Sequence, residues 1–214
     1  MAKAGIIGSG VVAQSLGAGF AKKGWEVMLG TSKPEKLADW KSKAGAKAKI
    51  GSFADAAKFG ELLVLAVKGP AAEEALRKAG LENLRGKPVL DACNPIAEVP
   101  PEDGVLRFFT GPNESLLERL QKLAPEAKLV KAFSCVGSAF MVDPKFADGK
   151  PTMFICGDDA GAKKKAAELC ESFGFEVADM GTAKAARAIE PLAMLWCIPG
   201  LRSNEWTHAF KLLK

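Results

Sequence analysis

The stretch AGIIGSGVVAQSL at residues 4–16 decides the fold, because it combines an apolar strand, a glycine turn and the start of a helix. The turn has the pattern Gly8-x-Gly10-x-x-Ala13, a dinucleotide-binding fingerprint with Ala in its last position. Gly8 permits a tight turn, Gly10 lets a pyrophosphate approach the backbone, and Ala13 lets the helix pack close to the strand. The free N–H groups at the start of the helix then face the phosphates. An ordinary strand–turn–helix corner also uses small residues, but this context favours a nucleotide site.

Apolar runs alternate with amphipathic stretches along the rest of the chain. Strands are expected at 4–7, 25–30, 46–50, 62–67, 88–92, 129–133, 152–156 and 175–178. Helices are expected at 11–23, 34–44, 53–59, 71–79, 113–123 and 160–173, with a loop at 94–112 and a helical tail at 183–214 that is interrupted at Pro199-Gly200. Strands separated by helices predict parallel βαβ units. The fold class is therefore α/β, a Rossmann-type doubly wound and mostly parallel sheet of about eight strands with C-terminal helices.

The length of 214 residues is sufficient for a full hydrophobic core, and no linker separates two large domains. We expect one dinucleotide-binding domain over residues 1–214. Residues 1–133 form its Rossmann core, and residues 134–214 extend the sheet and add the C-terminal helices. These last helices are expected to pack near the edge of the sheet, close to the ligand crevice.

The charge and hydropathy patterns narrow the range of partners. The net charge is +5, and the lysines are dispersed apart from Lys163-Lys164-Lys165, without interleaved aromatic residues. This pattern argues against nucleic-acid binding and agrees with a small anionic ligand. The apolar run at 191–201 is shorter than the roughly 20 residues that a membrane span needs. With an N-terminus that opens directly into a strand, we expect no signal peptide, no membrane association and a cytoplasmic location.

Cysteine and histidine usage predicts neither a metal site nor a catalytic triad. The five cysteines contain no CxxC pair and are odd in number, which argues against disulfides and zinc; they are Cys93, Cys135, Cys156, Cys170 and Cys197. The only histidine, His208, has no ligand cluster near it in the sequence. We therefore expect no metal and no catalytic side chain.

The residues after the second strand indicate which dinucleotide binds. NAD-binding Rossmann folds place an acidic residue there, about 20 residues after the glycine loop, to hold the ribose 2′-hydroxyl. This chain has Thr31 and Ser32 at that place, followed by Lys33 and Lys36. Hydroxyl and ammonium groups bind a 2′-phosphate that a carboxylate would repel. The pattern favours NADP over NAD. The same residues would also be found at a helix N-terminus that is capped by Thr or Ser and has its lysines in solvent. Glu35 is discordant, but it lies in the following helix.

The run GIIGSGVVAQSLGAGFAKKGWEVMLGTSKPEK at residues 5–36 resembles the start of the F420-dependent NADP oxidoreductases. These enzymes carry hydride between NADPH and an 8-hydroxy-5-deazaflavin. The segments DACNP (91–95), LVKAFSCVGSAF (129–140), FICGDD (154–159) and GTAKAARAIEPLAMLW (181–196) fall where that family has similar segments. The chain is also similar to the cytosolic reductase domain of six-transmembrane ferric reductases. The resemblance extends over essentially the whole chain.

The resemblance implies a set of site residues at the carboxyl ends of the strands. The pyrophosphate would be held by Gly8, Ser9, Gly10, Val11 and Val12, and the 2′-phosphate by Thr31, Ser32, Lys33 and Lys36. The ribose and nicotinamide would lie against Ala66, Val67, Lys68, Ala92, Asn94 and Pro95, and Ser134, Cys135 and Val136 would face the second cofactor. The implied cofactors are NADP(H) and a diffusible 8-hydroxy-5-deazaflavin, with FMN or FAD as alternatives. A homodimer is one oligomeric state consistent with this pattern.

Direct hydride transfer requires two rings held face to face rather than an acid, a nucleophile or a metal. Cys135 has two interpretations, a nucleophile or a small wall residue, and the second is favoured because no base accompanies it. Small residues at 134–139, including Gly137, predict an open platform for a flat ring. Three functions remain open: a deazaflavin-dependent NADP reductase, an NADPH-dependent flavin or ferric reductase, and a non-catalytic NADP-binding module.

Overall fold

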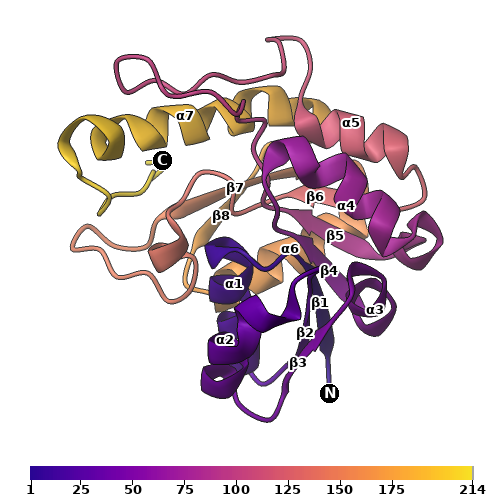
Figure 1. The fold of residues 1–214 in the computed structure, drawn as a ribbon. Coiled ribbons are helices and arrows are strands. Elements are labelled where there is room, and N and C mark those ends of the chain that lie inside the picture. Colours follow the sequence, from indigo (N-terminus) through magenta and orange to yellow (C-terminus); the bar gives the residue numbers. More distant parts are fainter. Residues whose placement is uncertain (214) are drawn as a thin grey trace.

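The computed structural model describes residues 1–213 and contains one eight-stranded sheet in the order β3-β2-β1-β4-β5-β6-β7-β8 (Figure 1). The strands are β1 (Lys3–Ile7), β2 (Glu26–Gly30), β3 (Ala48–Gly51), β4 (Leu62–Leu65), β5 (Pro88–Asp91), β6 (Lys128–Lys131), β7 (Thr152–Gly157) and β8 (Glu176–Asp179). The helices are α1 (Val11–Lys22), α2 (Ala38–Ala44), α3 (Phe53–Phe59), α4 (Ala72–Ala79), α5 (Leu116–Leu123), α6 (Ala160–Ser172) and α7 (Ala186–Ser203). The predicted α/β, doubly wound and mostly parallel class is confirmed.

The direction of the strands changes once, between β6 and β7. Strands β1 to β6 pair in parallel, whereas β7 pairs antiparallel with β6 through Val130↔Gly157 and Lys131↔Cys156. The connection between these two strands contains only the short 3₁₀ turn Ser138–Phe140 and no crossover helix. A parallel return needs a long crossover, usually a helix, so the chain here reverses direction. Strand β8 then pairs in parallel with β7.

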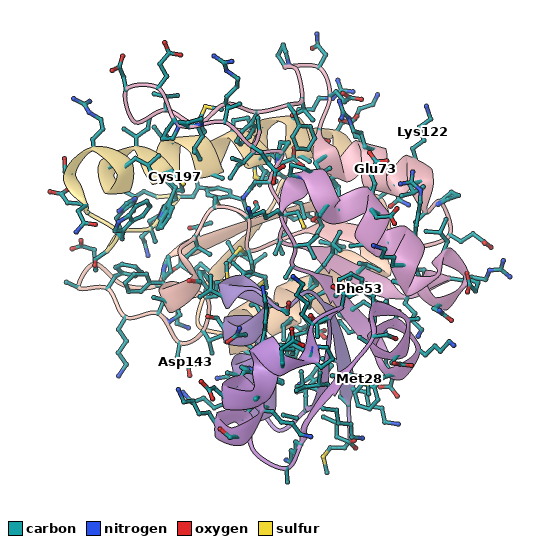
Figure 2. The ribbon with its side chains drawn as sticks, viewed as in Figure 1. Met28, Phe53, Glu73, Lys122, Asp143 and Cys197 are labelled. Carbon is teal, nitrogen blue, oxygen red and sulfur yellow. The ribbon has the colours of Figure 1, made fainter. Side chains whose placement is uncertain are left out.

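Two apolar clusters cover the two faces of the sheet. Neighbouring strand residues alternate between them, as Ile6 and Ile7 do on β1, because successive side chains point to opposite faces. Helices α1, α2 and α6 pack on one face, and α3, α4, α5 and α7 contribute to the other (Figure 1). Figure 2 shows Lys122 of α5 directed outward, as expected for the polar side of an amphipathic helix. Ligand-binding loops are thus left at the carboxyl edge of the strands.

Most element boundaries lie within two or three residues of those predicted, and the differences have local causes. The helix expected from residue 113 begins at Leu116, because the Ser115 hydroxyl accepts a hydrogen bond from the Glu118 N–H and caps it. The helix expected at 34–44 starts with a 3₁₀ turn at Pro34–Leu37. Strands β4 and β6 end two residues early, where the chain leaves the sheet to form the crevice loops.

The C-terminal tail differs most from the prediction. Helix α7 continues through Pro199-Gly200 to Ser203, so the expected break is wrong. Gly200 is buried against the Trp206 ring, and this packing offsets part of the cost of Pro199, one of the two prolines inside α7. The expectation of a helical end is also wrong for residues 204–213, because Asn204 terminates α7 in the left-handed conformation (φ 57°). The next segment runs beside β7, where the Phe210 carbonyl accepts from the Thr152 N–H at 2.9 Å. Lys214 lies outside the described residues.

Between residues 1 and 213 the structure contains no helix with both the length and the apolar character needed to cross a membrane.

Candidate functional site

The loops that follow β1, β2, β4 and β5 enclose a cavity of about 460 Å³ at the carboxyl edge of the sheet. Its lining residues are Gly8, Ser9, Gly10, Val11, Val12, Thr31, Ser32, Phe53, Ala66, Val67, Lys68 and Ala92. All of these except Phe53 (Figure 2) were named from the sequence. Phe53 was missed because it belongs to no motif; it is simply the first residue of α3 after β3.

The glycine loop has the geometry that a phosphate site requires. Gly8 adopts φ +146°, and a Cβ there would lie 2.2 Å from the Ala66 carbonyl oxygen, so no other residue fits between β1 and β4. At Gly10 a Cβ would meet no atom within 4 Å, which leaves open space beside the N-terminus of α1. No side chain caps this terminus and its first turn holds no acidic residue. Its N–H groups are therefore available to an anion, and the loop fits a pyrophosphate.

The four residues expected to bind the 2′-phosphate differ in burial and in whether they line the cavity. The hydroxyl of Thr31, which is buried, donates to Ser9 Oγ at 3.1 Å and accepts from the Lys33 N–H at 3.0 Å, so it braces the loop. Ser32 is exposed and lines the cavity, whereas Lys33 is exposed outside it. Lys36 lines a separate groove between α1 and α2. The cavity lining contains no acidic side chain, which agrees with a phosphorylated ribose.

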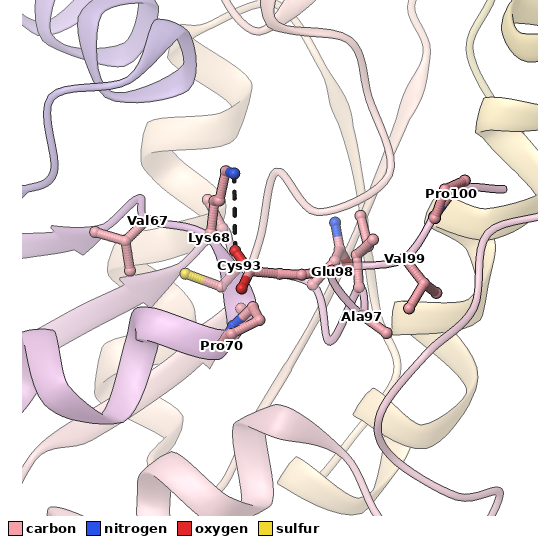
Figure 3. A pocket seen from close by; sticks show the side chains of 12 residues that line it. Val67, Lys68, Pro70, Cys93, Ala97, Glu98, Val99 and Pro100 are labelled. Atoms are coloured by element: carbon pink, nitrogen blue, oxygen red, sulfur yellow. Dashed lines mark ion pairs between the residues drawn. The ribbon is translucent and has the colours of Figure 1, made fainter.

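A second cavity of about 420 Å³ adjoins the first and shares Val67, Lys68 and Ala92 with it (Figure 3). Its other lining residues are Gly69, Pro70, Cys93, Asn94, Ile96, Ala97, Glu98, Val99 and Pro100. Across it, Lys68 Nζ lies 3.9 Å from Glu98 Oε1, the ion pair dashed in Figure 3. Residues 96–100 were missed because a loop carries no periodic pattern; the unusual length of the Pro-rich segment was the available signal.

Asn94 connects this second cavity to the segment after β6. Its side-chain N–H donates to the Ser134 carbonyl at 2.7 Å. Four of the expected site residues are buried behind Asn94 and line neither cavity: Pro95, Ser134, Cys135 and Val136. Within residues 1–213, three buried side-chain oxygens lack a hydrogen-bond partner: Asn94 Oδ1, Ser134 Oγ and Asp91 Oδ2, of which the last lies 2.6 Å from Lys131 Nζ in an ion pair. Unpartnered buried polar atoms are uncommon in folded proteins, so Asn94 Oδ1 has spare capacity to accept a hydrogen bond at the wall of this cavity.

Cys135 is held in its thiol form. Burial raises its pKa to about 12, and a thiol with so high a pKa is a poor nucleophile at neutral pH. All five cysteines are free, and four of them are buried. The geometry thus favours the interpretation of Cys135 as a small wall residue over that of a nucleophile.

The expectation of an open platform after β6 is wrong. A Cβ at Gly137 would lie 2.8 Å from two carbons of the Trp196 indole, so α7 covers this position. Trp196 is itself held by His208: the two rings stack at 4.9 Å, and Trp196 Nε1 donates to the His208 carbonyl at 2.9 Å. Trp206 also packs against Trp196, and the centroids of their rings lie 5.6 Å apart. These contacts join distant parts of the chain and had no local signal in the sequence.

The sheet order, the glycine loop and the two adjoining cavities define a Rossmann-type dinucleotide-binding fold. Residues 3–95 match the model of a family described as NADP oxidoreductase, coenzyme F420-dependent. A crystal structure from Arthrobacter sp. FB24, proposed to be an F420-dependent NADP-reductase, superposes with a TM-score of 0.91 at 32% identity and covers 100% of both chains. The chain therefore belongs to the F420-dependent NADP oxidoreductase family.

Two curated relatives show how the family extends. The F420-dependent NADP reductase of Methanocaldococcus jannaschii is 28% identical over 183 residues, which cover 79% of each protein. Metalloreductase STEAP3 of Rattus norvegicus is 30% identical over 204 residues, or 93% of this chain. The match covers only 38% of the rat protein, so this chain corresponds to one part of it. These comparisons confirm the resemblance stated from the sequence at the level of the family. They also confirm the expected general class, an NADP-dependent oxidoreductase.

Proposed function

We propose that this protein transfers a hydride directly between NADP(H) and a diffusible 8-hydroxy-5-deazaflavin. The observation that carries the proposal is the pair of adjoining cavities, one against the glycine loop and one against Asn94, in a chain of this family. NADPH, when bound, supplies the hydride. The protein contributes binding, alignment of the rings and exclusion of water, and these need no catalytic side chain.

The dinucleotide would lie across both cavities. Residues 8–12 would hold the pyrophosphate through the N–H groups at the start of α1, with Gly10 leaving room for it. Ser32 and the neighbouring lysines would hold the 2′-phosphate. Residues 66–68 with Ala92 and Asn94 would line the ribose and nicotinamide, and Asn94 Oδ1 has unused capacity to accept from a carboxamide N–H. Ser134, Cys135, Val136 and Pro95 would support this end from behind.

A flavin or ferric reductase is the second candidate, favoured by the similarity to the rat metalloreductase over 93% of this chain. In that case FMN or FAD would relay electrons from NADPH. A non-catalytic NADP-binding module is the third. Trp196 covers Gly137, so a diffusible acceptor is supported by the similarity to the family and not by an open platform.

One spectrophotometric assay separates the three functions. NADPH oxidation is followed with the deazaflavin, FMN, FAD, and ferric chelate with and without flavin. We expect turnover with the deazaflavin and a colourless preparation. A yellow preparation with stoichiometric flavin contradicts a diffusible acceptor. Turnover with ferric chelate plus flavin alone supports the second candidate, and NADPH binding without any turnover supports the third. Light scattering on the same preparation tests the predicted homodimer.

Cofactor choice is tested at Ser32 and Lys36. Replacing both by Ala should weaken NADPH binding by about 1–3 kcal/mol, the range for charge-assisted hydrogen bonds, and leave NADH nearly unchanged. Calorimetric titration of both dinucleotides gives the comparison, and Ser32→Ala alone shows whether Lys36 leaves its groove to contribute. Lys41→Ala, which removes an exposed charge on the following helix α2, is the matched control. Equal losses for NADPH and NADH would contradict a 2′-phosphate site.

A further inference from the structure

A buried cluster of three charged side chains lies directly beneath the second cavity. Lys131 at the end of β6 and Asp91 at the end of β5 are fully buried, and Glu190 of α7 is 1% exposed. Lys131 Nζ lies 2.6 Å from Asp91 Oδ2, 2.7 Å from Glu190 Oε1 and 2.9 Å from the Cys93 carbonyl oxygen. The ammonium group donates a hydrogen bond to the Cys93 carbonyl and forms ion pairs with the two carboxylates.

The cluster holds the segment that follows β5 from two sides. Lys131 binds the Cys93 carbonyl, and Asp91 Oδ1 accepts a hydrogen bond from the Cys93 N–H at 2.9 Å. Both polar groups of the Cys93 backbone are therefore tied to the cluster. The flanking residues Ala92 and Asn94 line the cavities, so the cluster determines where these two residues lie.

The same cluster attaches two helices to this segment. Glu190 Oε2 accepts from the Leu116 N–H at 2.9 Å and Oε1 from the Leu117 N–H at 3.0 Å, so the carboxylate of α7 caps the start of α5. The cluster carries one more negative than positive charge, and the positive end of the α5 dipole offsets the excess. The lysine remains charged: burial alone would lower its pKa, but Asp91 and Glu190 together raise it above the ordinary value.

Stability alone does not account for such a cluster. Replacing buried ion pairs by apolar side chains of similar volume is often neutral or stabilising, because removing charges from water is costly. A charged cluster differs from an apolar one in its directionality, since its hydrogen bonds hold named backbone atoms in one place. Here those atoms belong to the segment between the two cavities.

We propose that Lys131, Asp91 and Glu190 are positioning residues that set residues 92–94 for the nicotinamide half of the dinucleotide and leave its adenosine half independent of them. This inference rests on the proposed NADP(H) function. It predicts that disturbing the cluster weakens binding of the whole dinucleotide but not of its 2′-phosphoadenosine fragment. Loss of general stability would affect both ligands alike.

The test compares the affinities of NADPH and 2′,5′-ADP for the full chain carrying Glu190→Gln or Lys131→Met. Lys131→Met leaves two buried carboxylates unpaired, and this variant could fail to fold. Glu190→Gln retains the shape of the side chain, so the test can still be made with this second variant. We expect the Kd of NADPH to rise about tenfold and that of 2′,5′-ADP to change less than about twofold. The blue shift of NADPH fluorescence on binding, which reports the nicotinamide environment, should shrink in parallel.

Val130→Ala is the matched control. It removes buried volume from the same strand, but its side chain packs on the opposite face of the sheet, away from Cys93. It should lower Tm without changing the ratio of the two affinities. Equal losses of NADPH and 2′,5′-ADP binding in Glu190→Gln, or no loss of either, would overturn the inference alone. A wild-type protein that binds neither ligand would overturn the proposed function and the inference with it.

Discussion

The two ends of the cleft are built in different ways. The end proposed to hold the phosphates comes mainly from residues 8–12 and 31–32, two short segments that directly follow the adjoining strands β1 and β2. The end proposed to hold the nicotinamide depends on the loops after β4, β5 and β6 and on α7, which are far apart in the sequence. The difference teaches that a local motif can be recognised from its residues, whereas an assembled surface needs the packing that brings its parts together.

The largest expected effect separates the two glycines of the phosphate end. Gly10→Val fills space that is open in the protein, so Tm should change little while NADPH and 2′,5′-ADP both bind at least about a hundredfold more weakly. Calorimetry and thermal unfolding measure the two quantities on one sample. Gly8→Ala is the contrasting variant, because its Cβ would meet the Ala66 carbonyl and the positive φ is strained, so it should lose stability. Normal NADPH binding by Gly10→Val would show that the glycine loop only connects β1 to α1 and does not bind the pyrophosphate.

An effect of intermediate size tests how Trp196 covers Gly137. Gly137→Ala places a methyl group 2.8 Å from the Trp196 indole, and overpacking of this kind costs about 1–3 kcal/mol in the free energy of unfolding. In the Trp196→Ala background the same change should cost much less, because the indole is gone. Denaturant unfolding of the four proteins in this double-mutant cycle measures the coupling. Additive effects would show that Trp196 does not press on Gly137.

The smallest effect concerns how α7 is attached to α5. Arg187 of α7 donates to both carboxylate oxygens of Glu118 of α5, at 2.9 and 2.7 Å. The hydrogen bond from Arg187 lowers the pKa of Glu118 below its ordinary value of 4.5, with further help from Ser115. A lowered pKa in the folded state means that the stabilisation is complete above about pH 4.5 and is lost as the pH falls through the folded value.

Arg187→Gln should therefore lower Tm at pH 7 by no more than about 2–4 °C, as for a partly exposed ion pair in a chain of this size. The difference from the wild type should disappear at a pH well below 4.5, where Glu118 is protonated in both states. Thermal unfolding across this pH range gives the measurement. A Tm difference that is constant with pH would assign the effect to packing of the Arg187 side chain and not to the ion pair.

Several elements could be predicted because their signals are local. Helix α3 was placed correctly at residues 53–59, since Ser52 and Asp55 form a capping box around its start. Strand β4 was recognised as buried on both faces from its unbroken apolar run. The end of α7 could not be placed, because Pro199-Gly200 normally ends a helix and only the contact with Trp206 shows why it does not here.

The sequence by itself determined the parallel βαβ units, the glycine loop and the lack of an acidic residue at position 31, because each depends on backbone preferences or side-chain types within a few residues. Only the tertiary structure decided the antiparallel turn into β7, the cover of Gly137 by Trp196 and the burial of Lys131 with Asp91 and Glu190. A lysine at the end of a strand has no local feature that predicts its burial. Its cost is offset only when carboxylates from two other elements and a helix terminus meet at the same point, and that meeting is a property of the packed fold.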